Sequence, residues 1–148
     1  MTNLAALFAD QRASQIDWDG PLFSLYEVPT GVEHLTIEFS SVGSELRQGV
    51  RLKARGARLT IDDVEDTDFV LWQDTSPRHV EVDLRWSARG ARSLRIWNTW
   101  VRDGVAHAWL GNAGMRVDDE GQGRYLLRCS DGAGEPTFDD LVVAVTAR

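Results

Sequence analysis

Hydrophobic and polar residues alternate with a period of two along most of the chain from residue 22 onward. Because successive side chains of a β-strand point to opposite faces of a sheet, this alternation predicts strands with one buried face. The expected strands are residues 22–28, 33–40, 49–54, 58–62, 69–73, 79–87, 93–102, 105–110, 124–130 and 141–146, with a short additional one at 115–117. Gly, Pro, Asp and Ser separate these segments, as is typical of turns.

The N-terminal segment, residues 1–17, has a different pattern. Residues 2–15 predict a short amphipathic helix, since Leu4, Leu7 and Phe8 fall on one side of it. No segment between the strands has the pattern of the helices that a βαβ unit requires. The 148 residues are therefore expected to form one all-β domain, an antiparallel β-sandwich of the jelly-roll type.

The alternation also suggests how three pairs of neighbouring strands align. A turn at Arg55-Gly56, a loop at 89–91 and a turn at Asp103-Gly104 would each join two strands into a hairpin. The aligned pairs would be Leu52 with Leu59, Val50 with Ile61, Trp86 with Leu94, Leu84 with Ile96, Trp100 with His107 and Asn98 with Trp109. A shift of one residue would reverse the faces of a strand, so the favoured pairings keep hydrophobic residues together.

Three of the six tryptophans lie between residues 93 and 114 and are expected to differ in exposure. The predicted pairing places Trp100 and Trp109 on the core face, where they would pack. Trp97 falls among charged residues on the opposite face and is expected to be exposed. An exposed indole can stack on a sugar ring or anchor a protein partner. The alternative is that the N-terminal segment or a second copy of the chain covers Trp97.

Two polar residues, Asn98 and His107, fall between the tryptophans on the predicted core face. Buried polar side chains need hydrogen-bond partners. One interpretation is a hydrogen-bonded pair beneath the aromatic residues. The other is a pocket where the sandwich opens, in which Asn98, His107, Trp100 and Trp109 contact a small polar ligand.

Charge, cysteine content and the motifs that do not occur argue against several classes of function. A net charge of −7 disfavours nonspecific binding to nucleic acid and to anionic membranes. The single cysteine, Cys129, is expected to be a buried apolar side chain. No Gly-x-Ser-x-Gly, P-loop, GxGxxG or HExxH motif occurs, so the chain is expected to be non-catalytic. No signal peptide or transmembrane segment is recognised, which favours a cytoplasmic location.

The loop before the last strand is a candidate cation site. Asp131 leaves one strand, and Thr137, Asp139 and Asp140 precede the next. Carboxylates at both ends of a loop can converge on one calcium ion, which prefers oxygen ligands. Calcium is therefore the one cofactor that the sequence suggests.

This loop resembles the closing hairpin of bacterial calcium-dependent galactose-binding lectins. In that family an aspartate, a threonine and two consecutive asparagines help to hold calcium, and the calcium holds the sugar. Asp131, Thr137, Asp139 and Asp140 occupy similar places, although the spacing from Asp131 to Thr137 is longer and aspartates replace the asparagines. The final FDDLVVAV is similar to the last strand of jelly-roll carbohydrate-binding modules. The resemblance implies a galactose-binding-like sandwich.

The leading functional hypothesis is a lectin-like carbohydrate-binding module, assisted by calcium and using Trp97 as a stacking platform. The alternative is a bacterial protein-interaction module, such as an immunity or assembly partner or a homo-oligomer. Its surface would be an aromatic patch around Trp97 and Leu110.

Overall fold

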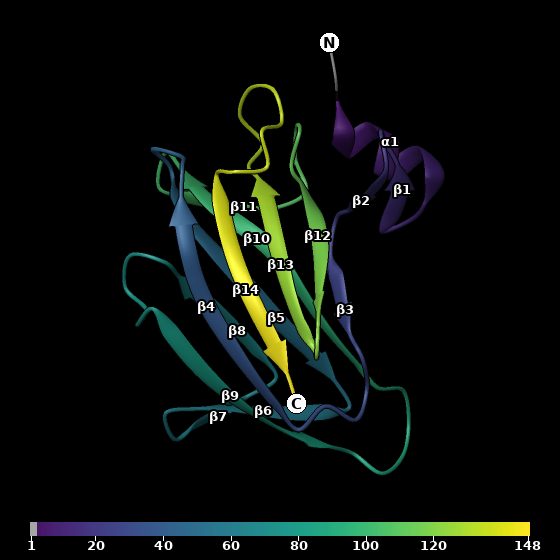
Figure 1. Ribbon diagram of the computed structural model, residues 1–148, viewed down its shortest axis with the longest axis vertical. Helices are drawn as coiled ribbons and strands as arrows, with labels where there is room; N and C mark the ends of the chain where they lie inside the picture. Colours follow the sequence, from purple (N-terminus) through teal and green to yellow (C-terminus); the bar gives the residue numbers. More distant parts are fainter. Residues whose placement is uncertain (1–2) are drawn as a thin grey trace.

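The computed structural model describes residues 3–148, which form two facing β-sheets and one short helix, α1 (Leu4–Gln11), beside them (Figure 1). The strands are β1 (Gln15–Asp17), β2 (Pro21–Phe23), β3 (Tyr26–Val28), β4 (His34–Val42), β5 (Arg47–Arg55), β6 (Ala57–Ile61), β7 (Val64–Asp66), β8 (Asp68–Trp72), β9 (His79–Trp86), β10 (Ser93–Arg102), β11 (Val105–His107), β12 (Gly114–Gly121), β13 (Arg124–Ser130) and β14 (Leu141–Ala147). The predicted all-β class with antiparallel sheets is confirmed. No helix within residues 3–148 has the length and hydrophobicity that crossing a membrane would require.

The strands are divided unequally between the sheets. The nine-stranded sheet has the order β1-β2-β12-β13-β14-β4-β9-β6-β7. In the five-stranded sheet the order is β11-β10-β5-β8, and β3 also pairs with β10. From β4 to β10 the chain passes repeatedly from one sheet to the other, whereas β12, β13 and β14 are consecutive neighbours. The sequence pattern did not predict the short edge strands β1 and β7.

The core lies between the two sheets and is built from the alternating hydrophobic positions of both. Leu35 and Ile37 of β4 and Val143 of β14 come from the larger sheet, and Leu52 and Ile96 come from the smaller one. All five are fully buried in one cluster. Burial of one such side chain contributes about 1.5–3 kcal/mol, so this cluster is the main source of stability.

Helix α1 is shorter than the predicted helix at residues 2–15 because its ends are capped. The Asn3 side chain accepts a hydrogen bond from the backbone nitrogen of Ala6, 3.1 Å away, and Arg12 ends the helix in a left-handed conformation. Leu4 and Phe8 are buried in a second cluster with Ile16 and Leu22. The predicted hydrophobic side of the helix therefore covers the β1-β2 edge of the larger sheet.

Residues 22–28, expected as one strand, form two strands in different sheets. β2 pairs with β1 and β12, whereas β3 pairs with β10. The break at Ser24 and Leu25 carries the chain from the larger sheet to the smaller one. Leu22 and Val28 are both buried and keep the period-two spacing across the break, so the alternation does not reveal it.

Two of the three predicted hairpins are wrong. β5 and β6 lie in different sheets, and so do β9 and β10. Leu52 pairs with Ile96 instead of Leu59, and Leu59 pairs with Leu84. The inward direction of these residues was predicted correctly, because a strand presents the same face to the core whichever sheet it joins. Alternation alone does not select the partner strand.

The two ARGAR pentapeptides, at 54–58 and 88–92, both lie at crossings between the sheets and contact each other. The backbone nitrogen of Ser87 donates to the carbonyl oxygen of Gly56, 2.8 Å away. Gly56 has φ +68°, and a Cβ there would lie 2.4 Å from the carbonyl oxygen of Ala91. Only glycine fits this close crossing.

Replacing Gly56 with alanine is therefore expected to destabilise the protein more than replacing Gly90. Gly90 also has a positive φ, +86°, but a Cβ there meets nothing within 4 Å. Gly90→Ala bears only the conformational cost of about 1–2 kcal/mol, whereas Gly56→Ala adds a steric clash. Urea unfolding of both variants measures the difference. Equal losses would show that the Ala91 carbonyl moves aside freely.

A surface network on β4 and β9 predicts a pH-dependent stability. His34 bonds through Nδ1 to Asp83, 2.8 Å away, and through Nε2 to Glu81. These two carboxylates, Asp83 foremost, raise the pKa of His34 above its ordinary 6.5. Because the raised pKa belongs to the folded state, the stabilisation is complete below pH 6.5 and is lost as the pH rises through the folded pKa.

Thermal unfolding measured from about pH 6 upward is expected to show a falling Tm for the wild-type protein and a smaller fall for His34→Gln. His79→Gln is the matched control, because His79 lies 3.7 Å from a single carboxylate, that of Glu38. Identical pH profiles for the wild-type protein and His34→Gln would contradict the assignment.

Candidate functional site

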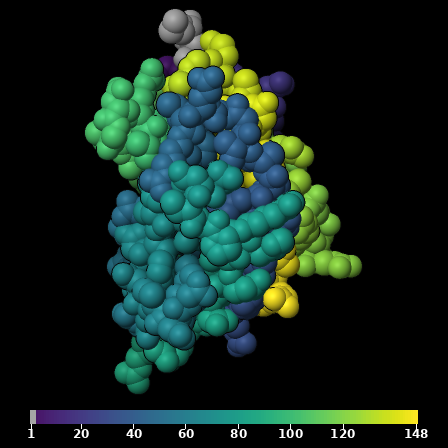
Figure 2. Space-filling model, turned by 90° about the vertical axis from the view of Figure 1, so that its left-hand side faces the viewer, coloured from purple at the N-terminus to yellow at the C-terminus, as the bar shows by residue number. Residues whose placement is uncertain are grey.

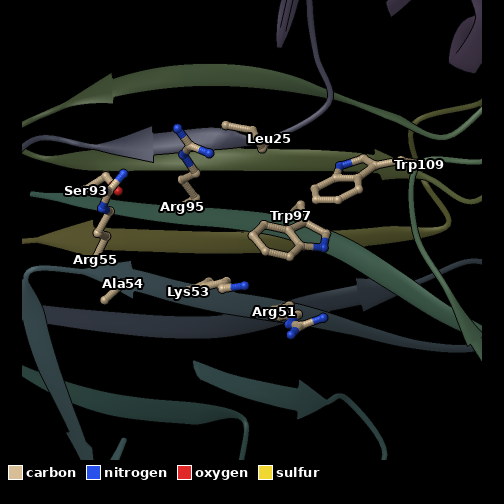
Figure 3. A pocket seen from close by; sticks show the side chains of 9 residues that line it. All are labelled: Leu25, Arg51, Lys53, Ala54, Arg55, Ser93, Arg95, Trp97 and Trp109. Carbon is tan, nitrogen blue, oxygen red and sulfur yellow. The ribbon is translucent and has the colours of Figure 1, made fainter. Parts of the chain in front are cut away.

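The candidate site is a cavity on the outer face of the five-stranded sheet. Its volume is about 330 Å³, within the usual range for small-molecule pockets. The lining residues, shown in Figure 3, are Leu25, Arg51, Lys53, Ala54, Arg55, Ser93, Arg95, Trp97 and Trp109. All but Leu25 and Trp109 belong to β5 or β10, so two central strands of the sheet build its floor.

The register of β5 and β10 brings the lining side chains together in pairs. Trp97 lies opposite Arg51, Arg95 opposite Lys53, and Ser93 opposite Arg55. The residues between them on each strand point into the core, so these pairs share the outer face. The pairs are neighbours along the strands, and the cavity therefore runs from an aromatic end to a cationic end (Figure 3).

Trp97 lies on the predicted face, but the prediction that it is exposed is wrong. Only 5% of its surface is accessible. The ring of Trp109 covers it, with 4.7 Å between the ring centroids and 32° between the planes, and the Arg51 guanidinium lies 5.6 Å from its centroid. Neither the N-terminal segment nor a second copy of the chain is needed to bury it. Trp97 acts as a support beneath Trp109.

Trp109 was expected in the core opposite Asn98, and this prediction is also wrong. The hairpin pairs Trp100 with His107 as expected, but β11 ends at His107. Trp109 itself has φ +58°, which turns the chain away from the strand path and leaves the residue 46% exposed. Its Nε1 donates to the carbonyl oxygen of Ser24, 2.9 Å away.

This conformation of Trp109 is costly for a bulky residue, by about 1–3 kcal/mol, and the contacts around it must compensate. The stack on Trp97 and the hydrogen bond to Ser24 hold the indole in a single orientation at the cavity mouth. Strained backbone of this kind is concentrated at binding sites. An exposed indole that is held by strain and by two fixed contacts is suited to stacking on a ligand.

Carboxylates pair with two of the four cationic side chains of the cavity. Arg51 donates two hydrogen bonds, of 2.9 and 2.5 Å, to Asp68. This pairing raises the pKa of Arg51 and lowers that of Asp68, to which the nearby charge of Lys53 also contributes. Arg95 donates to Glu27 at 3.1 Å.

Lys53 and Arg55 have no carboxylate within 4.0 Å among residues 3–148. With Arg51 and Arg95 each paired to one carboxylate, Lys53 and Arg55 leave an excess of two positive charges at the cavity. The site is therefore locally cationic although the chain carries a net charge of −7. Such a local excess of positive charge attracts anionic groups.

Three other residues predicted to bind a ligand do not line this cavity. Asn98 is 3% exposed and donates through Nδ2 to the carbonyl oxygen of Ser130, 2.9 Å away, so it does not pair with His107. Trp100 is buried, with its ring centroid 6.3 Å from that of half-buried His107. The predicted pocket of four residues is not formed, because Trp109 lies on the outer face.

Asp131, predicted to bind calcium, is a buried centre of hydrogen bonds. It is 2% exposed, and its Oδ2 accepts from Ser44 Oγ at 2.8 Å and from Gln48 Nε2 at 3.0 Å. Its Oδ1 accepts from the backbone nitrogen of Ala133 at 3.0 Å. These bonds tie the β4–β5 connection to the loop 131–140, which lie side by side at one end of the molecule, in blue and yellow in Figure 2.

Of the other three predicted calcium ligands, Asp140 lies next to Asp131, whereas Thr137 and Asp139 bond each other. Asp140 Oδ2 accepts from the backbone nitrogen of Asp131 at 2.9 Å, whereas the Thr137 hydroxyl donates to the exposed Asp139. Burial raises the pKa of Asp140, and the nearby negative charges of Asp131 and Asp139 raise it further.

Within residues 3–148 no group of three or more His, Cys, Asp or Glu side chains is placed to hold a metal ion. Donors of the protein itself already occupy both oxygens of Asp131, so the four residues do not fit a calcium site as arranged. The Oε1 atom of Gln48 is buried without a partner among the described residues, but the nitrogen of the same amide is the atom that bonds Asp131. Calcium assistance stays a prediction without support from these contacts.

Cys129 is fully buried, as expected. Burial raises the pKa of its thiol well above the ordinary value. Because the thiolate is the reactive form, this side chain is an inert part of the core.

Sequence reasoning missed Lys53, Arg55, Ser93 and Arg95 as site residues. Alternation did place Lys53 and Arg95 on outer faces, because their neighbours Leu52, Leu94 and Ile96 are apolar, whereas Arg55 was assigned to a turn. The sequence did not predict that these residues share a site, because the hairpin partners were predicted wrongly. Only the pairing of β5 with β10 places Lys53 and Arg55 beside the strand of Trp97.

The chain was compared with known proteins at the levels of family, sequence and structure. No protein-family model matches it, and neither a curated protein nor a solved structure matches. The resemblance to galactose-binding lectins therefore stays a prediction based on residues 131–140, and function must be argued from the site.

Proposed function

We propose that the protein is a non-catalytic carbohydrate-binding module and that its site is the cavity beneath Trp109. The supporting observation is the half-exposed Trp109 indole, fixed over Trp97 at the mouth of a cavity with several hydrogen-bond donors. A saccharide presents both an apolar ring face and hydroxyl groups. The apolar ring face can stack on the indole of Trp109. The hydroxyl groups can form hydrogen bonds with Lys53 and Ser93.

We also propose the finer description of the fold as a jelly roll. Support comes from the nested pairing of strands, in which β4 pairs with β9 in one sheet and β5 pairs with β8 in the other. A ribbon of antiparallel strands that is rolled across two sheets gives this order. The edge strands β1, β2 and β7 would be additions to it.

The proposal is tested by titrating the protein with a panel of neutral and acidic oligosaccharides. Tryptophan fluorescence is a direct reporter, because a ligand stacked on Trp109 changes the environment of its indole. At least one member is expected to bind the wild-type protein and to lose affinity for Trp109→Ala. The proposed function would be contradicted if no oligosaccharide of the panel bound the wild-type protein, or if Trp109→Ala bound as tightly as the wild-type protein.

A second candidate, a protein-interaction module, has an observation of its own. Trp109 and Leu110 are adjacent and exposed by 46% and 52%. They lie near an apolar hollow of about 430 Å³ that Phe8 and Ala9 of α1 line with Trp109. The predicted patch of Trp97 and Leu110 is corrected to Trp109 and Leu110, since Trp97 is buried.

Leu110→Glu separates the two candidates, because Leu110 does not line the saccharide cavity. If the exposed pair binds protein, this variant is expected to abolish self-association in sedimentation experiments. If the cavity binds saccharide, the same variant retains the affinity of the wild-type protein. A monomeric wild-type protein would remove the homo-oligomer form of the second candidate.

A further inference from the structure

We infer that the saccharide ligand is acidic and that Lys53 and Arg55 bind its carboxylate or sulfate group. This inference rests on the proposed function and names the substrate class of the same cavity. Its basis is the arrangement of two unpaired cations next to a fixed aromatic platform.

Within the described part of the chain, Lys53 and Arg55 lack a carboxylate partner, whereas the neighbouring cations Arg51 and Arg95 each have one. Arg51 is held by Asp68 and Arg95 by Glu27. Neither Lys53 nor Arg55 has a carboxylate within 4.0 Å among residues 3–148, yet both line the cavity. A ligand that brings an anionic group would supply the missing partner.

The two cations lie along the cavity from the indole of Trp109. Figure 3 shows Trp97 and Trp109 at one end of the cavity, Arg55 and Ser93 at the other, and Lys53 between them. The pair Lys53–Arg95 is two residues along the strands from the pair Arg51–Trp97. Two residues of a strand span about 7 Å. A ring stacked on Trp109 can therefore direct an acidic substituent, or that of the next ring, towards Lys53.

The positive charge of Lys53 and Arg55 would make the cavity selective for anionic ligands. A hydrogen bond that involves a charged group is stronger than a neutral one, which gives roughly a tenfold preference for an acidic over a neutral saccharide of the same size. The chain as a whole is negatively charged, so anions are attracted to this surface and repelled by most others. Nucleic acid fits less well than a short acidic saccharide, because its extended phosphate backbone would meet the carboxylates that flank the cavity and the overall net charge of −7.

The first experiment is a calorimetric titration with four probes: an oligogalacturonate, a sulfated oligosaccharide, a neutral oligogalactoside and a short single-stranded DNA. The expected result is that one of the two acidic saccharides binds at least about tenfold more tightly than the neutral one and that added salt weakens this binding. The two acidic probes distinguish a carboxylate from a sulfate ligand. Equal affinity for the neutral probe, or tightest binding of DNA, would overturn the inference.

The outcomes separate this inference from the proposed function. Equal binding of neutral and acidic saccharides would leave a carbohydrate-binding module and remove only the role of charge. Absence of binding by all three saccharides would remove both proposals.

Variants test the two residues directly. Lys53→Gln and Arg55→Gln are each expected to lower affinity for the acidic saccharide by about tenfold and affinity for the neutral one by much less. Arg102→Gln, which removes an exposed arginine of the neighbouring strand β10 outside the cavity, is the matched control. An unchanged Tm shows that each variant is folded. Wild-type affinity of both site variants would overturn the inference.

Chemical labelling gives an independent readout, because Lys53 is the only lysine of the chain. Acetylation by an amine-reactive reagent can be followed at this residue by peptide mass spectrometry. Saturating acidic saccharide is expected to slow the acetylation of Lys53, with the N-terminal amine as internal reference. An unchanged rate under saturation would show that Lys53 does not contact the ligand.

Discussion

Replacing Trp97 with alanine is expected to lower the free energy of unfolding by about 3–5 kcal/mol, the usual loss for a large buried aromatic side chain. Trp97 is 5% exposed and is enclosed by Trp109 and Arg51. Its removal would leave a hollow on the outer face of the sheet and would take away the support of the Trp109 indole. Guanidinium unfolding followed by circular dichroism measures this loss.

Trp109→Ala is the contrasting variant. Trp109 is half exposed, so we expect a loss of stability below about 1.5 kcal/mol together with a loss of saccharide affinity of more than about tenfold. The two adjacent indoles would thus have separate roles, one in stability and one in binding. A Trp97→Ala variant as stable as the wild-type protein would show that the indole stack is not formed.

Asp131→Ala is expected to cost about 3 kcal/mol. The substitution leaves the hydroxyl of Ser44, the amide of Gln48 and the backbone nitrogen of Ala133 without their acceptor in a buried place. Loss of the negative charge also removes repulsion with Asp140, which offsets part of the penalty. Urea unfolding is the appropriate measurement.

Asp139→Ala is the matched control from the same loop. Asp139 is exposed and accepts from Thr137, so its removal should change stability by less than about 0.5 kcal/mol. Both measurements are repeated with millimolar calcium and with EDTA. The same values in both conditions are expected if Asp131 is a structural hydrogen-bond acceptor. A calcium-dependent rise in the wild-type Tm that Asp131→Ala abolishes would instead make Asp131 a calcium ligand.

Much of the local structure could be predicted from the sequence because each strand has one face towards the core. The strand at residues 93–102 was predicted with its observed bounds, Ser93–Arg102. The turn at Asp103-Gly104 was also predicted correctly, since short-range turn chemistry requires no distant partner. The sheet to which each strand belongs was not predictable in this way. Gly56 looks like a hairpin turn in the sequence, but it joins β5 of one sheet to β6 of the other.

The candidate site was predicted less well than the fold. The face of Trp97 was correct, but the exposed and buried roles of Trp97 and Trp109 were exchanged. The cause is a single backbone conformation, the positive φ of Trp109, which reverses the direction of one side chain. Such a conformation is maintained by distant contacts, here with Trp97 and Ser24, that no local pattern contains.

By itself, the sequence determined the all-β class, most of the strands and the face that each strand presents to the core, because these depend on a period of two along the chain. Only the tertiary structure decided which strands are neighbours. That decision placed Lys53 and Arg55 beside the strand of Trp97 and moved Trp109 to the outer surface. The physical reason is that a hydrophobic face is buried equally well in either sheet, so partner choice depends on crossings and close contacts between residues far apart in sequence.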